Sequence, residues 1–146
     1  MYQPDLETFI KEGLKIARDR LLPAATQKMK DDFTVAMQSA REIFGDDAFR
    51  KRYEARARRR PLNKAYFEVI STSLAKMSER ERQLLIERKE LLKKNLLSLM
   101  QDDRFWNSFS MGTGTRDSVL QRFGGFKRAV EDTLAGREVH GKGGAR

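Results

Sequence analysis

Apolar residues recur at steps of three and four along most of this chain, which is the spacing of one face of an α-helix. The clearest run lies between Thr26 and Gly45, a glycine suited to a left-handed helix end, and consists of Met29, Phe33, Ala36, Met37, Ala40, Ile43 and Phe44. The sequence contains no pair of strand-like runs, with alternating apolar and polar residues, joined by a hairpin turn. The spacing therefore predicts an all-α fold, a single-domain bundle of about five main helices.

Start and stop residues set the bounds of the longer helices. A first helix is expected over residues 5–22, ended by the proline that follows it. Another is expected over residues 63–77. Ser78 with Glu81 then matches a capping box, in which each side chain satisfies a free backbone N–H of the first turn. A single long helix that reaches Met100 should follow.

Two short segments and a last helix complete the predicted bundle. One of the two acids at residues 46–47 caps a short helix that extends to Tyr53. Residues 102–107 form a short aromatic turn or helix, and the last helix begins at the end of a glycine-containing loop, residues 110–116, and ends at Gly136. The aromatic side chains expected in the core rather than in a base-stacking platform are Phe105, Trp106 and Phe109.

The positive charge of the chain is concentrated in short segments. The 146 residues carry a net charge of +9, and seven basic residues against one acid fall within residues 50–60, a basic connector without an apolar period. Residues 137–146 hold three glycines and one large apolar side chain, too little to offset the entropy of ordering them. We therefore expect a helical bundle domain over residues 1–136 and a flexible basic tail over residues 137–146.

The basic connector is the main candidate for a binding surface. Guanidinium groups bind phosphate oxygens in pairs and release condensed counterions, and Tyr53 adds a stacking face, so nucleic acid is the favoured partner. An acidic protein partner, or a solvated linker that only aids solubility, remains open. The predicted nucleic-acid-binding residues are Arg50, Lys51, Arg52, Arg56, Arg58, Arg59 and Arg60.

The glycine-containing loop before the last helix is a second candidate site. Free N–H groups and the helix dipole at a helix start could hold a phosphate or another anion. The spacing of the glycines is neither that of a Walker loop nor that of a dinucleotide fingerprint, so a tight turn between helices is the competing interpretation. The candidate anion-binding residues are Gly112, Thr113, Gly114, Thr115 and Arg116.

Several classes of function lack their residues. Cysteine is absent, which excludes disulfides, thiolate metal sites and cysteine nucleophiles and is typical of a reducing compartment such as the cytoplasm. No apolar run approaches the roughly 20 residues that span a bilayer, and the N-terminus lacks the pattern of a signal peptide. The one histidine, His140, falls in the predicted tail, and the acid pairs at residues 46–47 and 102–103 are interpreted as helix caps. We therefore expect no catalytic residue, metal, cofactor or membrane contact.

Four short motifs carry a resemblance to a known family. They are Ala48-Phe49-Arg50, Asn63-Lys64-Ala65-Tyr66-Phe67-Glu68, Ser110-Met111-Gly112-Thr113-Gly114-Thr115 and Arg122-Phe123. With these motifs, residues 30–134 resemble the C-terminal helical region of GmrSD-type restriction proteins, a family that includes many ParB-like phage-defence proteins.

The resemblance implies a function without chemistry of its own. In that family a separate N-terminal ParB-like domain carries the nucleotide-handling motif Asp-Gly-Gln-Gln-Arg, and some members add an HNH-type nuclease domain; this sequence contains neither. The expectation is a non-catalytic accessory module of a restriction or phage-defence system that binds DNA or a ParB-like catalytic partner. A structural subunit that packs against such a partner without contacting nucleic acid, and an enzyme completed in trans through the glycine loop, are the alternatives.

Overall fold

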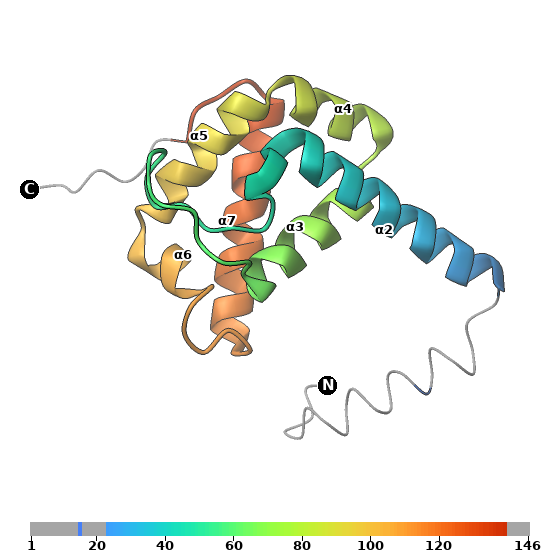
Figure 1. Cartoon of the computed structure of the whole chain (residues 1–146), viewed down its shortest axis with the longest axis horizontal. Coiled ribbons are helices and arrows are strands. Elements are labelled where there is room, and N and C mark those ends of the chain that lie inside the picture. The colour runs from blue at the N-terminus through green and yellow to red at the C-terminus, as the bar shows by residue number, and fades with distance from the viewer. Residues whose placement is uncertain (1–14, 16–22, 140–146) are drawn as a thin grey trace, which may run out of the picture.

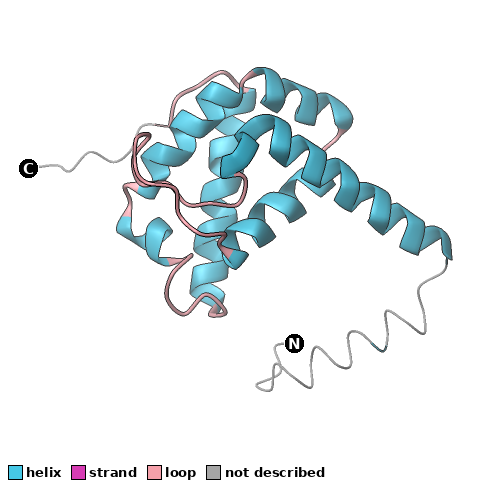
Figure 2. Cartoon of the chain, viewed as in Figure 1, coloured by secondary structure: helices cyan, strands magenta, loops and turns pink. Residues whose placement is uncertain are grey.

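The computed structural model describes residue 15 and residues 23–139, which contain helices and no strand (Figures 1 and 2). The elements are α2 (Pro23–Phe44), the 3-10 turn η1 (Gly45–Asp47), α3 (Lys64–Lys76), α4 (Glu79–Glu87), α5 (Lys89–Met100), α6 (Asp103–Asn107) and α7 (Arg116–Leu134). The prediction of an all-α, single-domain bundle is confirmed. The helix predicted over residues 5–22 lies outside the described residues except for Lys15, which is helical.

Helix α7 lies at the centre of the bundle. It packs against α3, α4, α5 and α6, while α2 crosses α3, α4 and α5 on the outside (Figure 1). Fully buried side chains come from every long helix, as the apolar spacing predicts; they include Ala36, Val69, Ile70, Leu85, Leu92, Phe126 and Ala129. Burial of such side chains is the main force that holds the helices together.

The closest approach between elements lies where α6 meets α7. Gly125 of α7 is buried, and a Cβ atom built there would lie 2.4 Å from Cε2 of Phe105. The ring of Phe105 therefore rests directly on the backbone of α7, and a glycine is required at this position. Phe105 also packs edge-to-face on Phe109, with ring centroids 5.1 Å apart, and both rings are buried as predicted.

Local capping signals fix most helix ends. The capping box is present: the Ser78 backbone N–H donates to Glu81 Oε2 over 2.8 Å, and the Glu81 N–H donates to Ser78 Oγ over 3.3 Å. The hydrogen bonds from the backbone and side chain of Ser78 lower the pKa of Glu81. Gly45 follows α2 with a φ of 58°, the left-handed conformation predicted for it, and Gly136, the predicted end of the last helix, has a φ of 71°.

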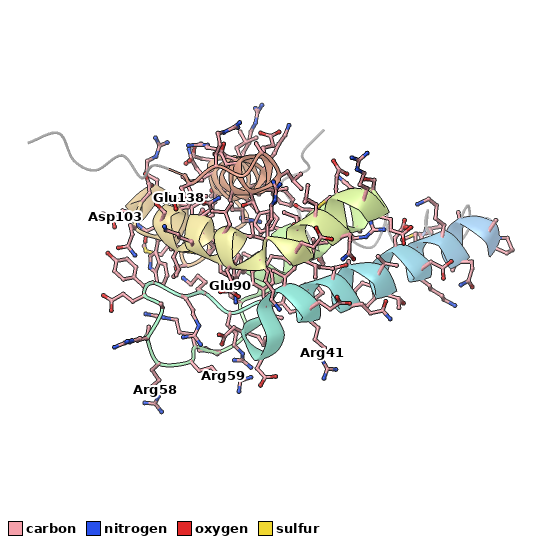
Figure 3. All side chains as sticks on the ribbon, turned by 90° about the horizontal axis from the view of Figure 1, so that it is seen from above. Arg41, Arg58, Arg59, Glu90, Asp103 and Glu138 are labelled. Carbon is pink, nitrogen blue, oxygen red and sulfur yellow. The ribbon has the colours of Figure 1, made fainter. Side chains whose placement is uncertain are left out.

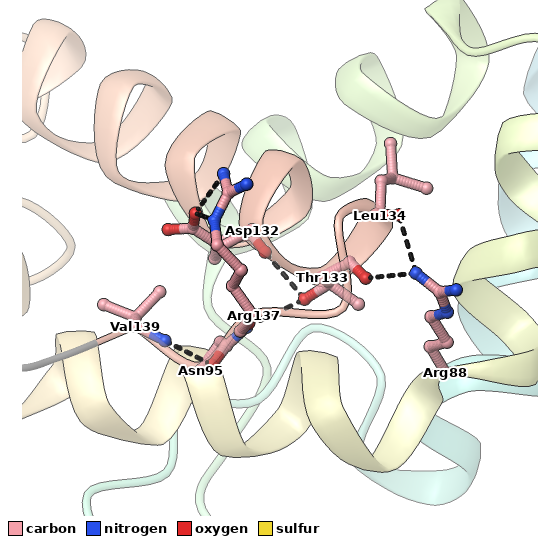
Figure 4. Close-up of polar contacts among 8 residues, drawn as sticks. Arg88, Asn95, Asp132, Thr133, Leu134, Arg137 and Val139 are labelled. Carbon is pink, nitrogen blue, oxygen red and sulfur yellow. Dashed lines mark hydrogen bonds and ion pairs between the residues drawn. The ribbon is translucent and has the colours of Figure 1, made fainter.

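The predicted single helix from Ser78 to Met100 is broken at Arg88, between α4 and α5, where φ is −102° and ψ is 24°. The break lets the Arg88 side chain reach the end of α7. Its Nη1 donates to the carbonyl oxygens of Thr133, at 3.2 Å, and Leu134, at 2.6 Å (Figure 4). The last carbonyls of a helix lack partners and carry partial negative charge, so a cation stabilises them.

The start of the predicted flexible tail is packed on α5. The Asn95 side chain, fully buried in α5, donates to the carbonyl of Arg137 over 3.0 Å and accepts from the backbone N–H of Val139 over 2.8 Å (Figure 4). Both hydrogen-bonding ends of one buried amide are thus satisfied by the chain that follows α7. Residues 137–139 of the predicted flexible tail therefore contact α5, and residues 140–146 lie outside the described residues.

The short helix predicted from residues 46–47 to Tyr53 is absent. Both acids lie inside η1, where neither side chain caps a helix, and residues 48–63 form no helix. Phe49 has a φ of 65°, a conformation that a helix cannot contain. Its ring packs edge-to-face on Phe67 with centroids 4.9 Å apart, and the Asn63 N–H donates to its carbonyl over 2.9 Å. These distant contacts outweigh the local preference.

Neighbouring glycines in α7 provide a matched test of the α6–α7 contact. Gly125→Ala should lower the free energy of unfolding by about 1–3 kcal/mol, because the new methyl group collides with the Phe105 ring. Gly124 has open space around it, so Gly124→Ala should raise the free energy by about 0.5–1 kcal/mol through helix propensity. Urea unfolding of both variants measures the difference, and equal effects would show that Phe105 does not rest on Gly125.

Candidate nucleic-acid interface

The basic residues 50–60 belong to a longer irregular segment, residues 48–63, which joins η1 to α3 and is called the connector from this point. It runs along α5 and α6 (Figure 1). A segment of this length without secondary structure is uncommon in a compact domain and is usually either a functional loop or a linker. Its two ends are joined, since the N–H of Asn63 donates to the carbonyl of Phe49 over 2.9 Å, and the Asn63 side chain donates to the carbonyl of Phe109 over 2.8 Å. The other backbone N–H and C=O groups of the connector have no helical hydrogen bonds and need side chains or water as partners.

Lys51 anchors the connector to α6. Its side chain is buried, with Nζ 3.9 Å from the centre of the Trp106 ring and in a hydrogen bond to Ser110 Oγ. Burial, followed by the charge of Arg60, lowers the pKa of Lys51. Tyr53 packs edge-to-face on the same indole with centroids 5.5 Å apart. Trp106 is half-buried and serves as a platform for the connector, a role that its local sequence does not indicate.

Arg50 and Arg52 hold the connector in shape from within. Arg52 pairs with Asp47, 2.6 Å from Nη2 to Oδ2, and donates to the carbonyl of Ala57 over 2.8 Å. Arg50 donates to the carbonyl of Arg60 over 2.5 Å. Guanidinium groups thus supply hydrogen bonds that the irregular backbone needs. Three of the seven predicted nucleic-acid contacts, these two and Lys51, are not exposed and are held by partners within the protein.

The four remaining predicted contacts, Arg56, Arg58, Arg59 and Arg60, are exposed and are called the outer arginines. Arg56 and Arg58 make no hydrogen bond or ion pair with any other described residue. Arg59 donates to the Asp46 carbonyl over 3.0 Å, and the guanidinium carbon of Arg60 lies 5.0 Å from the centre of the Trp106 ring. Arg58 and Arg59 point away from the bundle (Figure 3).

Helix α2 adds a cation that the connector motif does not reveal. Arg41 is exposed and points to the same side of the molecule as Arg58 and Arg59 (Figure 3). Along the chain it is an ordinary polar position on the outer face of a helix. The folded structure, and not the spacing along the chain, brings Arg41 to the same side as the outer arginines (Figure 3).

The glycine-containing loop is built as a turn between α6 and α7. Gly112 has a φ of 54°, and the Thr115 side chain caps α7 by accepting from the Ser118 N–H over 3.2 Å. The carbonyl of Thr113 accepts from Arg122, a buried arginine that also forms a 2.7 Å ion pair with Glu68 of α3. Thr113 and Thr115 thus have structural roles, as a hydrogen-bond acceptor and as a helix cap. Gly112, Gly114, Thr115 and Arg116 are exposed.

Acidic residues in the described part of the chain do not converge on a site. The Asp102 side chain caps α6 by accepting from the Phe105 N–H over 3.1 Å, as predicted, and Asp47 pairs with Arg52. Among residues 15 and 23–139, no group of three or more His, Cys, Asp or Glu side chains could hold a metal ion. No helix in the same residues combines the length and apolarity needed to cross a bilayer. His140 lies outside them.

The lowered pKa of Lys51 predicts how the free energy of unfolding depends on pH. The folded state holds the Lys51 proton more weakly than the unfolded chain, whose lysine pKa is 10.5, so the unfolded state binds more protons between the two pKa values. The free energy of unfolding should therefore rise with pH in this window, relative to a Lys51→Met variant that lacks the titration. Urea unfolding of both proteins from neutral pH to 10.5 measures the gap; a gap that stays constant would contradict the burial of the charge.

Comparisons with known proteins leave the interface to be interpreted from its own geometry. No protein-family model, curated protein or solved structure matches this chain. The described residues present one conspicuous feature, an irregular connector that is anchored by a buried lysine and displays arginines without acidic partners.

Proposed function

We propose that this protein binds nucleic acid, with duplex DNA as the preferred form, through the outer arginines and performs no chemistry of its own. The supporting observation is that Arg56 and Arg58 are exposed cations without a hydrogen bond or ion pair to any described residue. Lys51, Arg50 and Arg52 hold the segment that displays them. A cation presented on an anchored loop loses less conformational entropy when it meets a phosphate.

The distribution of charge favours a polyanion over a single acidic group. The net charge is +9, and the outer arginines lie within five consecutive residues, with Arg41 on the same side (Figure 3). A row of guanidinium groups fits the regular spacing of phosphates, and each neutralised phosphate releases counterions. An acidic protein would need carboxylates at matching positions, whereas DNA provides phosphates along its whole length.

The proposal has a broader part that depends on the resemblance to GmrSD-type restriction proteins alone. In it, the protein is the accessory module of a restriction or phage-defence system, and a ParB-like protein supplies the catalysis. The DNA-binding part does not require this setting and is tested separately.

Charge reversal of the outer arginines tests the DNA-binding part. Binding of the wild-type chain to a fluorescent duplex should weaken steeply with salt, with a log–log slope of roughly −0.9 for each phosphate neutralised. Replacing Arg56, Arg58, Arg59 and Arg60 by Glu should remove roughly three to four units of that slope and most of the affinity. Fluorescence anisotropy at several salt concentrations measures both quantities.

A matched control separates the connector from net charge. Exposed basic residues on four different helices, Lys76, Arg80, Lys89 and Arg128, make no ion pair with another described residue, and their reversal to Glu gives the same net charge as reversal of the outer arginines. This control variant should lose much less affinity. A flat salt dependence in the wild type, or equal losses in the two variants, would defeat the proposal.

A second candidate function, protein docking without nucleic acid, is favoured by the outer face of α2. Met29 and Phe33 lie one helical turn apart and are 58% and 53% exposed. Large apolar side chains exposed together are a common feature of surfaces that receive a partner helix.

Paired substitutions test the docking hypothesis. A chain with Met29→Glu and Phe33→Glu should fail to retain a ParB-like protein from the same host that the wild type retains in affinity purification, because the charges are costly to bury in an apolar interface. The same variant should keep its DNA affinity. Equal retention of that protein by the two chains would exclude α2 as the docking face.

A further inference from the structure

A cleft of about 390 Å³ lies between the connector and α5. Its volume falls within the range of small-molecule sites, roughly 300–1,000 Å³. Apolar side chains from α2 and α5, with the ring of Tyr66, form part of its lining, and Arg50, Arg52 and Lys93 stand among them. Glu90, also in the lining, lies on α5 where that helix overlooks the connector (Figure 3). The outer arginines do not line this cleft.

The cleft carries an excess of positive charge. Four basic and two acidic side chains line it. Asp47 already pairs with Arg52, Glu90 pairs with Lys93 over 2.6 Å, and Lys94 pairs with Glu138, outside the lining, over 2.6 Å. Arg50, in contrast, donates only to backbone carbonyls, at Asp46 and Arg60, among the described residues. An anion that entered the cleft would therefore meet a guanidinium charge that no carboxylate neutralises.

Tyr66 is a buried polar side chain without a partner. It is 5% exposed, it lines the cleft, and its hydroxyl makes no hydrogen bond with another described residue. Its ring is fixed by an edge-to-face contact with Phe109, with centroids 5.2 Å apart. Its hydroxyl oxygen is not fully enclosed, so a ligand that entered the cleft would replace water as its hydrogen-bond partner. Burial raises the pKa of Tyr66, which keeps the hydroxyl protonated and able to donate.

We propose that the cleft binds a phosphorylated small molecule of nucleotide size. Its planar, weakly polar ring would lie on the apolar lining beside Leu96 and Met100, and its phosphate would meet Arg50 and Lys93, with Tyr66 donating a further hydrogen bond. A phosphate monoester is an anion at neutral pH, and Arg50 is the cation of the lining that pairs with no carboxylate among the described residues. Arginine is the side chain best shaped for phosphate oxygens.

Calorimetric titration with the four common nucleoside monophosphates tests the ligand class. At least one should bind the full chain with one-to-one stoichiometry, and the matching nucleoside and inorganic phosphate should each bind at least tenfold more weakly. A nucleoside that binds as tightly as its monophosphate would overturn the role of the phosphate. Failure of all four monophosphates to bind at millimolar concentration would overturn the proposal.

Two substitutions test the location. Tyr66→Phe removes only the hydroxyl and keeps the ring contact with Phe109, and Lys93→Gln removes one charge at the cleft; each should weaken monophosphate binding roughly tenfold. Lys89→Gln, on the same helix but outside the lining, should leave the affinity unchanged. Thermal unfolding confirms that each variant is folded. Unchanged affinity in both cleft variants would place the ligand elsewhere and overturn the assignment.

The inference does not depend on the proposed function. Reversal of the outer arginines should abolish DNA binding and leave monophosphate binding intact, since none of them lines the cleft. Loss of both activities in that variant would overturn the cleft as a separate site.

Discussion

The buried ammonium group of Lys51 on the Trp106 ring is the contact on which the irregular half of this structure depends. The helices bury continuous apolar faces, but the connector has no hydrogen-bonded ladder and few apolar contacts with the bundle beyond those of Phe49 and Tyr53. A cation withdrawn from water is costly unless it gains compensating interactions. The indole and Ser110 supply them, and in return the lysine fixes where the connector crosses the bundle.

That constraint divides the basic residues of the connector into two kinds. Arg50 and Arg52 donate to backbone carbonyls and an acid within the segment, so their charges serve the fold before any partner arrives. Arg56 and Arg58 take no part in this scaffold. The basic residues of the connector therefore do not form one surface: Arg50 and Arg52 hold its backbone, and Arg56 and Arg58 are exposed toward a phosphate backbone.

The sequence predicts what depends on neighbours along the chain and misses what depends on distant ones. The capping box at Ser78 and the helix end at Gly136 are local, and both are present as predicted. The break at Arg88 has no glycine or proline to mark it, and the partner of the Arg88 side chain, the end of α7, lies 45 residues away. The packing of residues 137–139 likewise follows from one buried amide, Asn95. The cleft is lined by residues of α2, the connector, α3 and α5, which are distant in sequence, so the sequence does not predict it.

Arg50 links the two proposed sites physically. Its guanidinium group lines the cleft and also holds the carbonyl of Arg60, one of the outer arginines. A phosphate in the cleft would compete for the same donors, so occupancy of the cleft and the conformation of the outer loop could not vary independently. By reciprocity, whatever such a ligand did to the affinity for nucleic acid, nucleic acid would do to the affinity for the ligand. The link would run through Arg50 alone, since the side chains of the outer arginines do not line the cleft.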